Sequence, residues 1–259
     1  MGSGTWRDYA AACLQWPGRV LFPPVCLACR DHVARPGTLC AGCWPAIRFL
    51  EKPWCEVMGT PFGHDMGEGF LSAEAIANPP PFARARAAVA YAGPARRMVQ
   101  HLKFHDRTDL APWMARWMLR AADELIPDAD LVVPVPLHRG RFLRRRFNQS
   151  AELGRAFARL AGLSFDPVAV ERVKGTRRQV GLGARERQDN VRGAFKVRPE
   201  KQIAVAGRRV ILVDDVYTTG ATVSSVARAL KRAGASDVDV LTFARVLPGD
   251  FRPDDADTI

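Results

Sequence analysis

Two adjacent carboxylates and a threonine-rich turn lie close together late in the chain. Asp214 and Asp215 follow an apolar run at residues 210–213, and a helical pattern starts at the segment Thr218, Thr219, Gly220, Ala221 and Thr222. A helix start offers free backbone N–H groups and a positive dipole end, which suit a phosphate, and Gly220 lets the backbone approach closely. Neighbouring carboxylates need a positive or hydrogen-bonding group between them, such as vicinal ribose hydroxyls or a hydrated magnesium ion. The segment therefore predicts a site for a ribose 5-phosphate.

The same residue types also suit a purely structural role. In that alternative, a strand leads into an N-capped helix, and the Asp and Thr side chains satisfy backbone donors. Two consecutive aspartates at the end of a strand argue against it, because their mutual repulsion has no structural use. We therefore favour the ligand site.

Four cysteines form two CxxC pairs near the start of the chain: Cys26, Cys29, Cys40 and Cys43. Two such pairs, ten residues apart, can close a tetrahedral thiolate shell around one zinc ion. Two disulfides or simply buried thiols are the alternatives; a reducing compartment disfavours the first, and the polar residues Arg30 and Gly42 disfavour the second. Cys55 has no CxxC partner, and such lone cysteines are more often small core residues, although Cys55, His32 or His64 could substitute in the shell.

The elements that must position these residues alternate between strand and helix. Strand-like apolar runs lie at residues 87–91, 131–135, 168–173, 194–197, 210–213 and 238–244, and helical patterns lie at residues 95–104, 111–125, 148–161 and 221–233. This alternation predicts an α/β domain with a parallel sheet covered by helices on both faces. Ligands bind beyond the carboxyl ends of the strands in such sheets, which is where the acidic pair stands.

A run of three prolines after Asn78 indicates a domain boundary. Residues 1–78 are punctuated by Cys, Pro and Gly and predict a small, loop-rich, zinc-ribbon-like module. Residues 82–248 hold the α/β pattern, and residues 249–259 predict a flexible acidic tail. A short helix is expected at residues 6–14.

The net charge of +11 is concentrated in one segment. Residues 139–198 contain 16 Lys or Arg and 5 Asp or Glu, whereas basic and acidic residues are equal in number elsewhere. Such a segment indicates an anionic partner, either the phosphates of a small ligand or a nucleic-acid backbone; an arginine-rich solvated face is the alternative.

A hydrophobic content of 47 % excludes disorder as the default. No apolar run is long enough to span a membrane, and no leader pattern is present, so we expect a cytoplasmic protein.

Residues 210–222 resemble the signature of phosphoribosyltransferases, which bind 5-phosphoribosyl 1-pyrophosphate. The resemblance extends to the ComF family through the double CxxC and several further segments: Leu102-Lys103-Phe104, Pro134-Val135-Pro136-Leu137, Arg145-Arg146-Phe147-Asn148-Gln149, residues 179–187 and residues 190–195. ComF proteins are phosphoribosyltransferase-like, carry an N-terminal zinc module, and are linked to natural competence and the use of external DNA. Two departures stand out. Arg146 replaces a frequent glycine, and Met58 stands where a second CxxC often occurs near Cys55, which removes the case for a further cysteine site.

The resemblance implies a type I phosphoribosyltransferase-like fold, with the first third of the chain forming a hood. It also implies transfer of phosphoribosyl from phosphoribosyl pyrophosphate, with Mg²⁺, to an unidentified acceptor. Asp214 and Asp215 would be catalytic and hold the ribose hydroxyls, and residues 218–222 would bind the 5′-phosphate. The cations expected to bind pyrophosphate lie on two loops and one helix: Arg139, Arg141, Arg144, Arg145, Arg177, Arg178 and Lys103.

Two other functions fit the same sequence. One is a non-catalytic module that senses nucleotides in the phosphoribosyl pocket and binds single-stranded DNA with its basic segment. The other assigns the work to the zinc module, which would dock a DNA-uptake helicase. Locally, Asn148 is expected to be the N-cap of the helix that follows it.

Overall fold

Five parallel strands form the centre of the larger part of the chain. The computed structural model describes residues 23–64, 66–67, 69–105, 107–137, 147–174 and 193–247. Contacts divide the chain into two compact units, residues 1–46 and residues 47–259, and each unit is described by itself. The boundary that the proline run indicates near residues 78–82 stays a prediction. The expected helix at residues 6–14 and the acidic tail lie outside the described residues.

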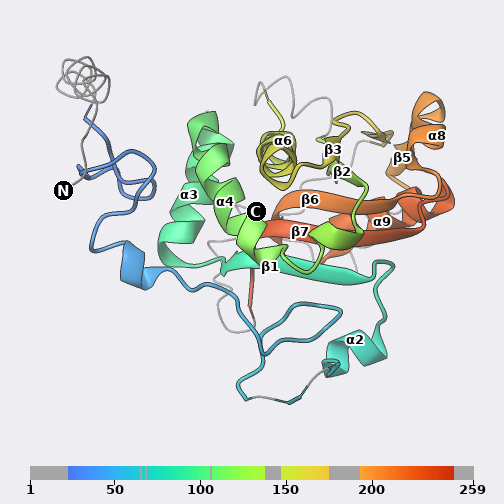
Figure 1. The fold of residues 1–259 in the computed structure, drawn as a ribbon, viewed down its shortest axis with the longest axis horizontal. Helices are drawn as coiled ribbons and strands as arrows, with labels where there is room; N and C mark the ends of the chain where they lie inside the picture. Colours follow the sequence, from blue (N-terminus) through green and yellow to red (C-terminus); the bar gives the residue numbers. More distant parts are fainter. Residues whose placement is uncertain are drawn as a thin grey trace, which may run out of the picture. The chain divides into compact units, whose positions relative to one another are not determined.

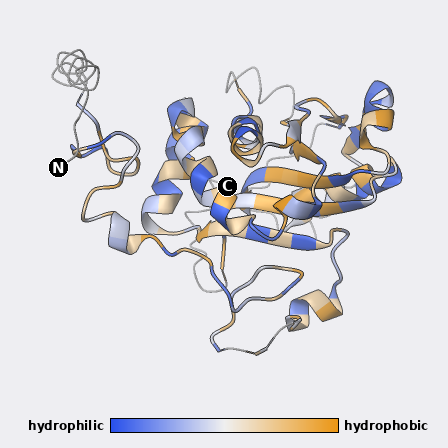
Figure 2. Cartoon of the chain, in the orientation of Figure 1, coloured by the Kyte–Doolittle hydropathy of each residue, from blue (hydrophilic) through white to orange (hydrophobic). Residues whose placement is uncertain are grey.

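The sheet has the order β1-β7-β6-β2-β3, and every neighbouring pair is parallel. Its strands are β1 (Arg84–Ala90), β2 (Leu131–Pro134), β3 (Ser164–Phe165), β6 (Arg209–Tyr217) and β7 (Asp237–Arg245). The predicted parallel sheet is therefore confirmed. Its central strands are apolar along most of their length (Figure 2).

The helices of this unit connect the strands (Figure 1). The longer ones are α3 (Gly93–Phe104), α4 (Ala111–Ala121), α6 (Gln149–Ala161) and α9 (Ala221–Arg232), and the shorter ones are α2 (Ala73–Ala77) and α8 (Gln202–Val205). Single 3-10 turns are η2 (Thr108–Leu110), η3 (Ile126–Asp128) and η4 (Pro199–Lys201). The predicted helices lie within a few residues of these bounds.

Both faces of the sheet are buried, and successive residues of a strand serve opposite faces. On one face, Leu131, Val133, Val210 and Leu212 belong to a core with residues of α9, including Val226 and Leu230. On the other face, Val213 lies close to Gly154 of α6, and Phe243 stacks on Trp117 of α4. Because each face has its own helices, the strands read as nearly continuous apolar runs.

The structure differs from the predicted elements in three places. The sheet ends in the short strand β3, which no predicted run covers. Strand β6 continues through the acidic pair to Tyr217, because its pairing with β7 continues from Asp214 opposite Thr242 to Tyr217 opposite Arg245. The runs near residues 170 and 195 form a separate antiparallel pair, β4 (Val170–Arg172) and β5 (Phe195–Val197), rather than strands of the main sheet. Alternation of apolar runs alone does not distinguish these two arrangements.

The described part of the smaller unit is a set of turns around four cysteines. A single bridge pairs Val25 with His32, and the one regular element is the 3-10 turn η1 (Trp44–Ala46) within residues 23–46. Backbone N–H groups of Leu27 and Arg30 bond to the carbonyls of Thr38 and Cys26, which closes the turns. Such a small apolar content cannot stabilise a fold alone, which is typical of metal-stabilised modules.

Candidate active site and metal site

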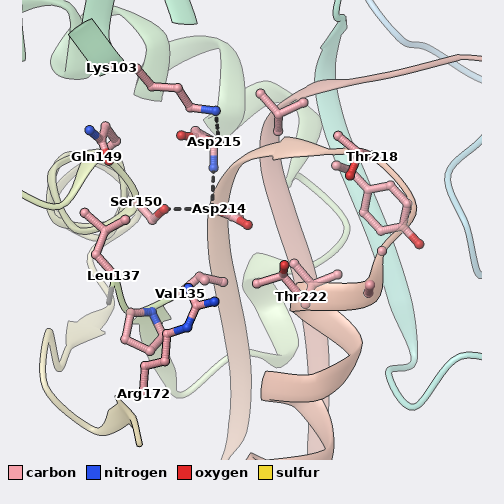
Figure 3. Close-up of a pocket in the computed structure, with 16 residues that line it drawn as sticks. Lys103, Val135, Leu137, Gln149, Ser150, Arg172, Asp214, Asp215, Thr218 and Thr222 are labelled. Atoms are coloured by element: carbon pink, nitrogen blue, oxygen red, sulfur yellow. Dashed lines mark hydrogen bonds and ion pairs between the residues drawn. The ribbon is translucent and has the colours of Figure 1, made fainter. Parts of the chain in front are cut away.

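A pocket lies where β2 and β6 end, at the carboxyl edge of the sheet (Figure 3). Four segments contribute polar side chains to it: Lys103 of α3, Gln149 and Ser150 at the start of α6, Arg172 of β4, and the stretch from Asp214 to Thr222. Pro136 and Leu137, just after β2, complete the wall. The pocket therefore lies where ligands bind in parallel sheets.

The acidic pair occupies the middle of this pocket. The hydroxyl of Ser150 donates to Asp214 Oδ1 at 2.7 Å, and the backbone N–H of Asp215 donates to the same oxygen at 2.9 Å. The Nζ of Lys103, itself buried, lies 3.1 Å from Asp215 Oδ1. Among the described residues, one ammonium contacts the acidic pair, and Arg172 adds a second positive charge to the pocket wall.

Burial, followed by the charge of Asp215, raises the pKa of Asp214 to about 7. The hydrogen bonds from Ser150 and from the Asp215 N–H and the charge of Lys103 act in the opposite direction. A cation, or hydroxyl donors from a ligand, would stabilise the charged form of this carboxyl group. Carboxyl groups with a raised pKa are frequent in active sites.

The start of α6 is tied to the end of β2 by a single side chain. The side-chain oxygen of Asn148 accepts from the N–H of Ser150 at 3.1 Å, and its Nδ2 donates to the carbonyl of Val135 at 3.0 Å. The predicted N-cap is therefore confirmed, and it also fixes Ser150 against the acidic pair. The positive end of α6 lies at the pocket as a consequence.

The turn before α9 forms the other side of the pocket. Gly220 has a φ of 72°, and a Cβ at this position would lie 2.3 Å from the hydroxyl oxygen of Tyr217. Only glycine fits there, for both conformational and steric reasons. Thr218, Gly220, Ala221 and Thr222 line the pocket, so the first turn of α9 presents backbone N–H groups and hydroxyls to one place. This arrangement can bind a phosphate.

In the smaller unit, the four cysteines converge. The Sγ atoms of Cys26, Cys29, Cys40 and Cys43 lie within 4.8 Å of one another, and none of these four residues forms a disulfide. Burial alone would raise the pKa of Cys26, but hydrogen bonds from the backbone at Cys29, Cys40 and Ala28 bring it down to about 6. Four thiolate donors at this separation fit a tetrahedral metal ion, and zinc is the usual one. The cysteines are therefore positioned to bind a metal.

Comparison with known proteins places this geometry in a family. A model described as "Double zinc ribbon domain" matches residues 18–75, and one described as "Phosphoribosyl transferase domain" matches residues 161–258. The DNA utilization protein YhgH of Escherichia coli K12 is 34% identical over 233 residues, covering 87% of this chain and 98% of that protein. The chain belongs to the ComF family. Competence protein F of Haemophilus influenzae is 30% identical over 233 residues, which cover 85% of this chain and 96% of that protein.

A solved structure of the allosteric regulatory enzyme of purine biosynthesis overlaps with 51% of this chain and 25% of its own, at 23% identity and a TM-score of 0.34. The fold class follows from the sheet and the family match: a parallel sheet with flanking helices, of the phosphoribosyltransferase type, and an N-terminal double zinc ribbon. No helix in the described ranges has the length and apolar character to cross a membrane.

For this ComF-family chain, the pocket contains most of the expected site residues that the structure describes. Asp214, Asp215 and Lys103 lie in it together with four of the five turn residues. Thr219 is the exception, because its side chain is exposed to solvent and is not part of the pocket wall. The arginines expected to bind pyrophosphate lie outside the described residues: Arg139, Arg141, Arg144, Arg145, Arg177 and Arg178.

Four residues of the pocket were not expected from the sequence: Gln149, Ser150, Arg172 and Tyr217. Ser150 contacts an aspartate 64 positions away, and no local pattern indicates such a contact. Gln149 is 1% exposed, and its Nε2 has no hydrogen-bond partner among the described residues. The Asn-Gln-Ser string that begins α6 was the available signal, and it indicated only a helix start.

Proposed function

We propose that the pocket binds 5-phosphoribosyl 1-pyrophosphate with Mg²⁺ and that the protein transfers the phosphoribosyl group to an acceptor nucleophile. The proposal depends on one observation: an acidic pair and a glycine-containing helix start meet in one pocket. The turn at residues 218–222 would bind the 5′-phosphate, and Asp214 and Asp215 would accept from the ribose hydroxyls. The family match to a phosphoribosyl transferase domain supports this assignment.

The carboxylates also suit the reaction. When the bond between C1 and the pyrophosphate oxygen breaks, the electron pair leaves with pyrophosphate, and the ribose carbon becomes oxocarbenium-like before the acceptor bonds to it. Asp214 and Asp215 would stabilise this positive charge more strongly in the transition state than in the ground state. Mg²⁺ prefers carboxylate, phosphate and water oxygens, which the acidic pair and the ligand offer, and it would supply positive charge to the departing pyrophosphate.

The decisive experiment is calorimetric titration with phosphoribosyl pyrophosphate in the presence and absence of Mg²⁺, followed by pyrophosphate release with purines, pyrimidines and amines as acceptors. Asp215→Asn should slow turnover by about a hundredfold or more, because one preorganised contact to the transition state contributes roughly 3 to 4 kcal/mol. Unchanged turnover in the folded variant would exclude this mechanism. If the wild-type protein releases or absorbs no heat on titration, phosphoribosyl pyrophosphate is excluded as the ligand.

A matched pair of threonines tests the phosphate turn. Thr218 lines the pocket, whereas the neighbouring Thr219 points to solvent. Thr218→Val should weaken ribose 5-phosphate binding by about tenfold, the effect of one lost hydrogen bond to a charged group. Thr219→Val should change it by less than about twofold, within the usual range of surface substitutions. Equal effects of the two substitutions would show that the turn does not bind the phosphate through the Thr218 hydroxyl.

The basic segment supports a second candidate, a non-catalytic module that binds single-stranded DNA. The relatives are described as a DNA utilization protein and a competence protein, and the excess of positive charge lies in residues 139–198. Its affinity for DNA should fall steeply with salt, and Arg144→Glu with Arg145→Glu should flatten that slope. Binding that is insensitive to salt would exclude this candidate. If instead a helicase docks on the zinc module, Cys40→Ser should abolish binding of that helicase.

We also propose that Cys26, Cys29, Cys40 and Cys43 hold one structural zinc ion. Their thiolates would complete its shell and leave no open position, so zinc would supply stability rather than catalysis. Chelation of the metal should unfold residues 23–46 and should leave ligand binding in the pocket unchanged.

A further inference from the structure

A second turn of the chain repeats the geometry of the first cysteine turn. In the first, the carbonyl of Cys26 accepts from the N–H of Arg30 at 3.1 Å, and Arg30 has a φ of 71°. In the second, the carbonyl of Cys55 accepts from the N–H of Gly59 at 2.7 Å, and Gly59 has a φ of 63°. Both turns lie within the stretch that matches the double zinc ribbon.

The thiols of the two turns accept the same kind of hydrogen bond from a later segment. The N–H of Cys40 donates to Cys26 Sγ at 3.3 Å, and the N–H of Ser72 donates to Cys55 Sγ at 3.2 Å. Ser72 thus takes the place of Cys40. By the same spacing, Met58 takes the place of Cys29, and Ala75 takes the place of Cys43.

This second set of side chains does not fit a metal ion. It offers one thiol, one thioether, one hydroxyl and a methyl group, whereas zinc needs four nitrogen, sulfur or oxygen ligands. The hydroxyl of Ser72 is already used, because it accepts from the N–H of Ala75 at 3.3 Å as the N-cap of α2. Across the described residues, the group at Cys26 to Cys43 is the only one suited to a metal.

A buried arginine contacts this second turn instead. Arg245, at the end of β7, is 5% exposed and donates from Nη1 to the carbonyl of Met58. It has no ion pair with a carboxylate among the described residues. Its guanidinium lies over the ring of Tyr217, 4.2 Å from the ring centre. Burial lowers the pKa of Arg245, and the nearby groups Tyr217, Glu74 and Cys55 oppose this effect.

Tyr217 connects this arginine with the ligand pocket. It lies in the pocket wall, and its hydroxyl lies so close to Gly220 that a Cβ there would be only 2.3 Å away. The ring therefore lies directly against the turn that we assign to the 5′-phosphate. A displacement of the ring would change the position of Gly220 and of the N–H groups that follow it.

We propose that Arg245 supplies, in a metal-free second ribbon, the positive charge that a metal ion supplies in the first, and that it positions the turn at Gly220 through Tyr217. Arg245 is a positioning residue in this account, because it acts through Tyr217 and touches no ligand. The second half of the proposal rests on the proposed function, whereas the first half, the metal count, is independent of it.

Elemental analysis tests the metal count. The full-length protein should contain one zinc per chain, Cys55→Ser should leave that content unchanged, and Cys29→Ser should reduce it. Two zinc ions per chain, one of them lost in Cys55→Ser, would overturn the first half of the proposal. This measurement needs no ligand, so it stands even if the protein binds no phosphoribosyl compound.

Titration with two probes tests the positioning role. Arg245→Met should weaken ribose 5-phosphate binding by about tenfold while leaving affinity for inorganic pyrophosphate unchanged, and Arg245→Lys should restore part of the loss. Arg116→Met is the control, because Arg116 lies over Trp113, 4.5 Å from its ring centre, on α4 and away from this turn. An equal loss of affinity for both probes, or no loss in a folded Arg245→Met protein, would overturn the positioning role of Arg245.

Tyr217→Leu keeps the proposal testable if Arg245→Met does not fold. It should weaken ribose 5-phosphate binding to a similar extent, and Tyr217→Phe, which keeps the ring over which the guanidinium lies but loses the hydroxyl beside Gly220, should lose less affinity than Tyr217→Leu. Full affinity in Tyr217→Leu would contradict the positioning role. Failure of wild type itself to bind ribose 5-phosphate would instead reject the proposed function.

Discussion

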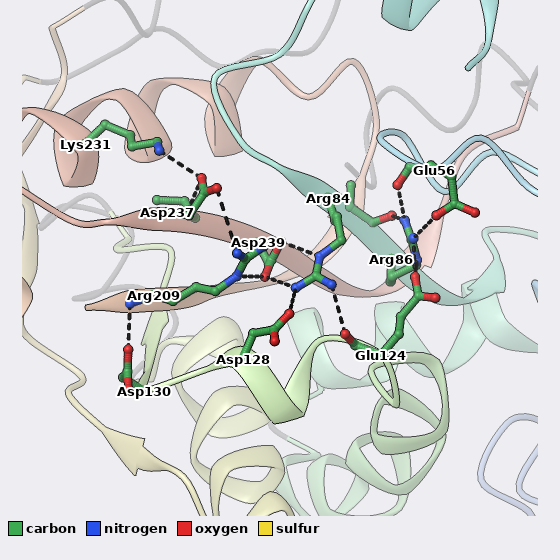
Figure 4. A network of polar contacts seen from close by, with 12 residues as sticks. Glu56, Arg84, Arg86, Glu124, Asp128, Asp130, Arg209, Lys231, Asp237 and Asp239 are labelled. Carbon is green, nitrogen blue, oxygen red and sulfur yellow. Dashed lines mark hydrogen bonds and ion pairs between the residues drawn. The ribbon is translucent and has the colours of Figure 1, made fainter. Parts of the chain in front are cut away.

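The two ends of the central sheet hold buried carboxylates in opposite electrostatic situations. At the amino end, Asp239 of β7 is fully buried between Arg84 and Arg209 (Figure 4). Arg84 donates to its two oxygens at 3.0 and 2.8 Å, and Arg209 does so at 3.2 and 2.8 Å. At the carboxyl end, Asp214 and Asp215 share the single ammonium of Lys103. Two guanidinium groups contact one fully buried carboxylate in the first case, with Asp128 and Asp237 on their partly exposed sides, whereas one ammonium contacts the acidic pair in the second.

This difference separates a structural network from a binding site. Hydrogen bonds to Asp239 raise the pKa of both Arg84 and Arg209, so the buried carboxylate stabilises the charge of both guanidinium groups. Burial and the charge of Asp215 raise the pKa of Asp214, which means that its charged form is held at a cost. A ligand with hydroxyls or a cation removes that cost at the carboxyl end, whereas nothing remains to be bound at the amino end.

The largest expected effect is at the amino end. Asp239→Asn leaves two partly buried guanidinium groups facing a neutral amide, so we expect the free energy of unfolding to fall by about 3 to 5 kcal/mol. Urea titration followed by far-UV circular dichroism measures this change. Asp237→Asn is the control, because Asp237 bonds to Lys231 at 2.8 Å with both groups partly exposed; its effect should stay below about 1 kcal/mol. Similar losses of stability in Asp239→Asn and Asp237→Asn would contradict the contrast between the two ends of the sheet.

The carboxyl end should respond in the opposite direction. Asp214→Asn keeps an oxygen to accept from Ser150 but removes the repelled charge, so the variant should be more stable than wild type by about 1 to 2 kcal/mol at pH 8. Because the folded protein raises the pKa of Asp214 to about 7, wild type loses stability as the pH rises through the range from its unfolded pKa to that value.

The advantage of the Asn variant should therefore shrink as the pH falls and should disappear below about pH 3, where Asp214 is protonated in both states. Thermal melts across this range measure it, and the same variant should lose affinity for the phosphoribosyl ligand. A variant that is less stable than wild type at pH 8 would show that Asp214 serves the fold rather than a ligand.

The sequence predicted those features that local patterns encode. Alternation of apolar runs predicted the parallel sheet, CxxC spacing predicted the cysteine group, and residue type predicted the Asn148 cap. The acidic pair and the turn residues were predicted from their order around a strand end, and the structure places all but Thr219 in one pocket.

The remaining features depend on contacts between distant parts of the chain. The contact of Arg245 with the Met58 carbonyl joins residues 187 positions apart, and the two arginines at Asp239 come from the starts of different strands. The strand limits of β6 also depended on its partner, because pairing with β7 carries polar residues into the sheet. No periodicity in one segment contains this information.

The smallest expected effect comes from an ion pair with good geometry and little burial. Arg107 and Asp109 lie 2.7 Å apart, but the Asp109 side chain is 59% exposed. Hydrogen bonding to Arg107 lowers the pKa of Asp109, so this pair stabilises the fold above the unfolded pKa and stops doing so as the pH falls through the lower folded value. Asp109→Asn should therefore cost less than about 0.5 kcal/mol at pH 7, measured by the same urea titration in low and high salt. A cost near that of Asp239→Asn would mean that contact geometry, rather than burial, sets the contribution of a carboxylate in this protein, and the contrast between the two sheet ends would lose its physical basis.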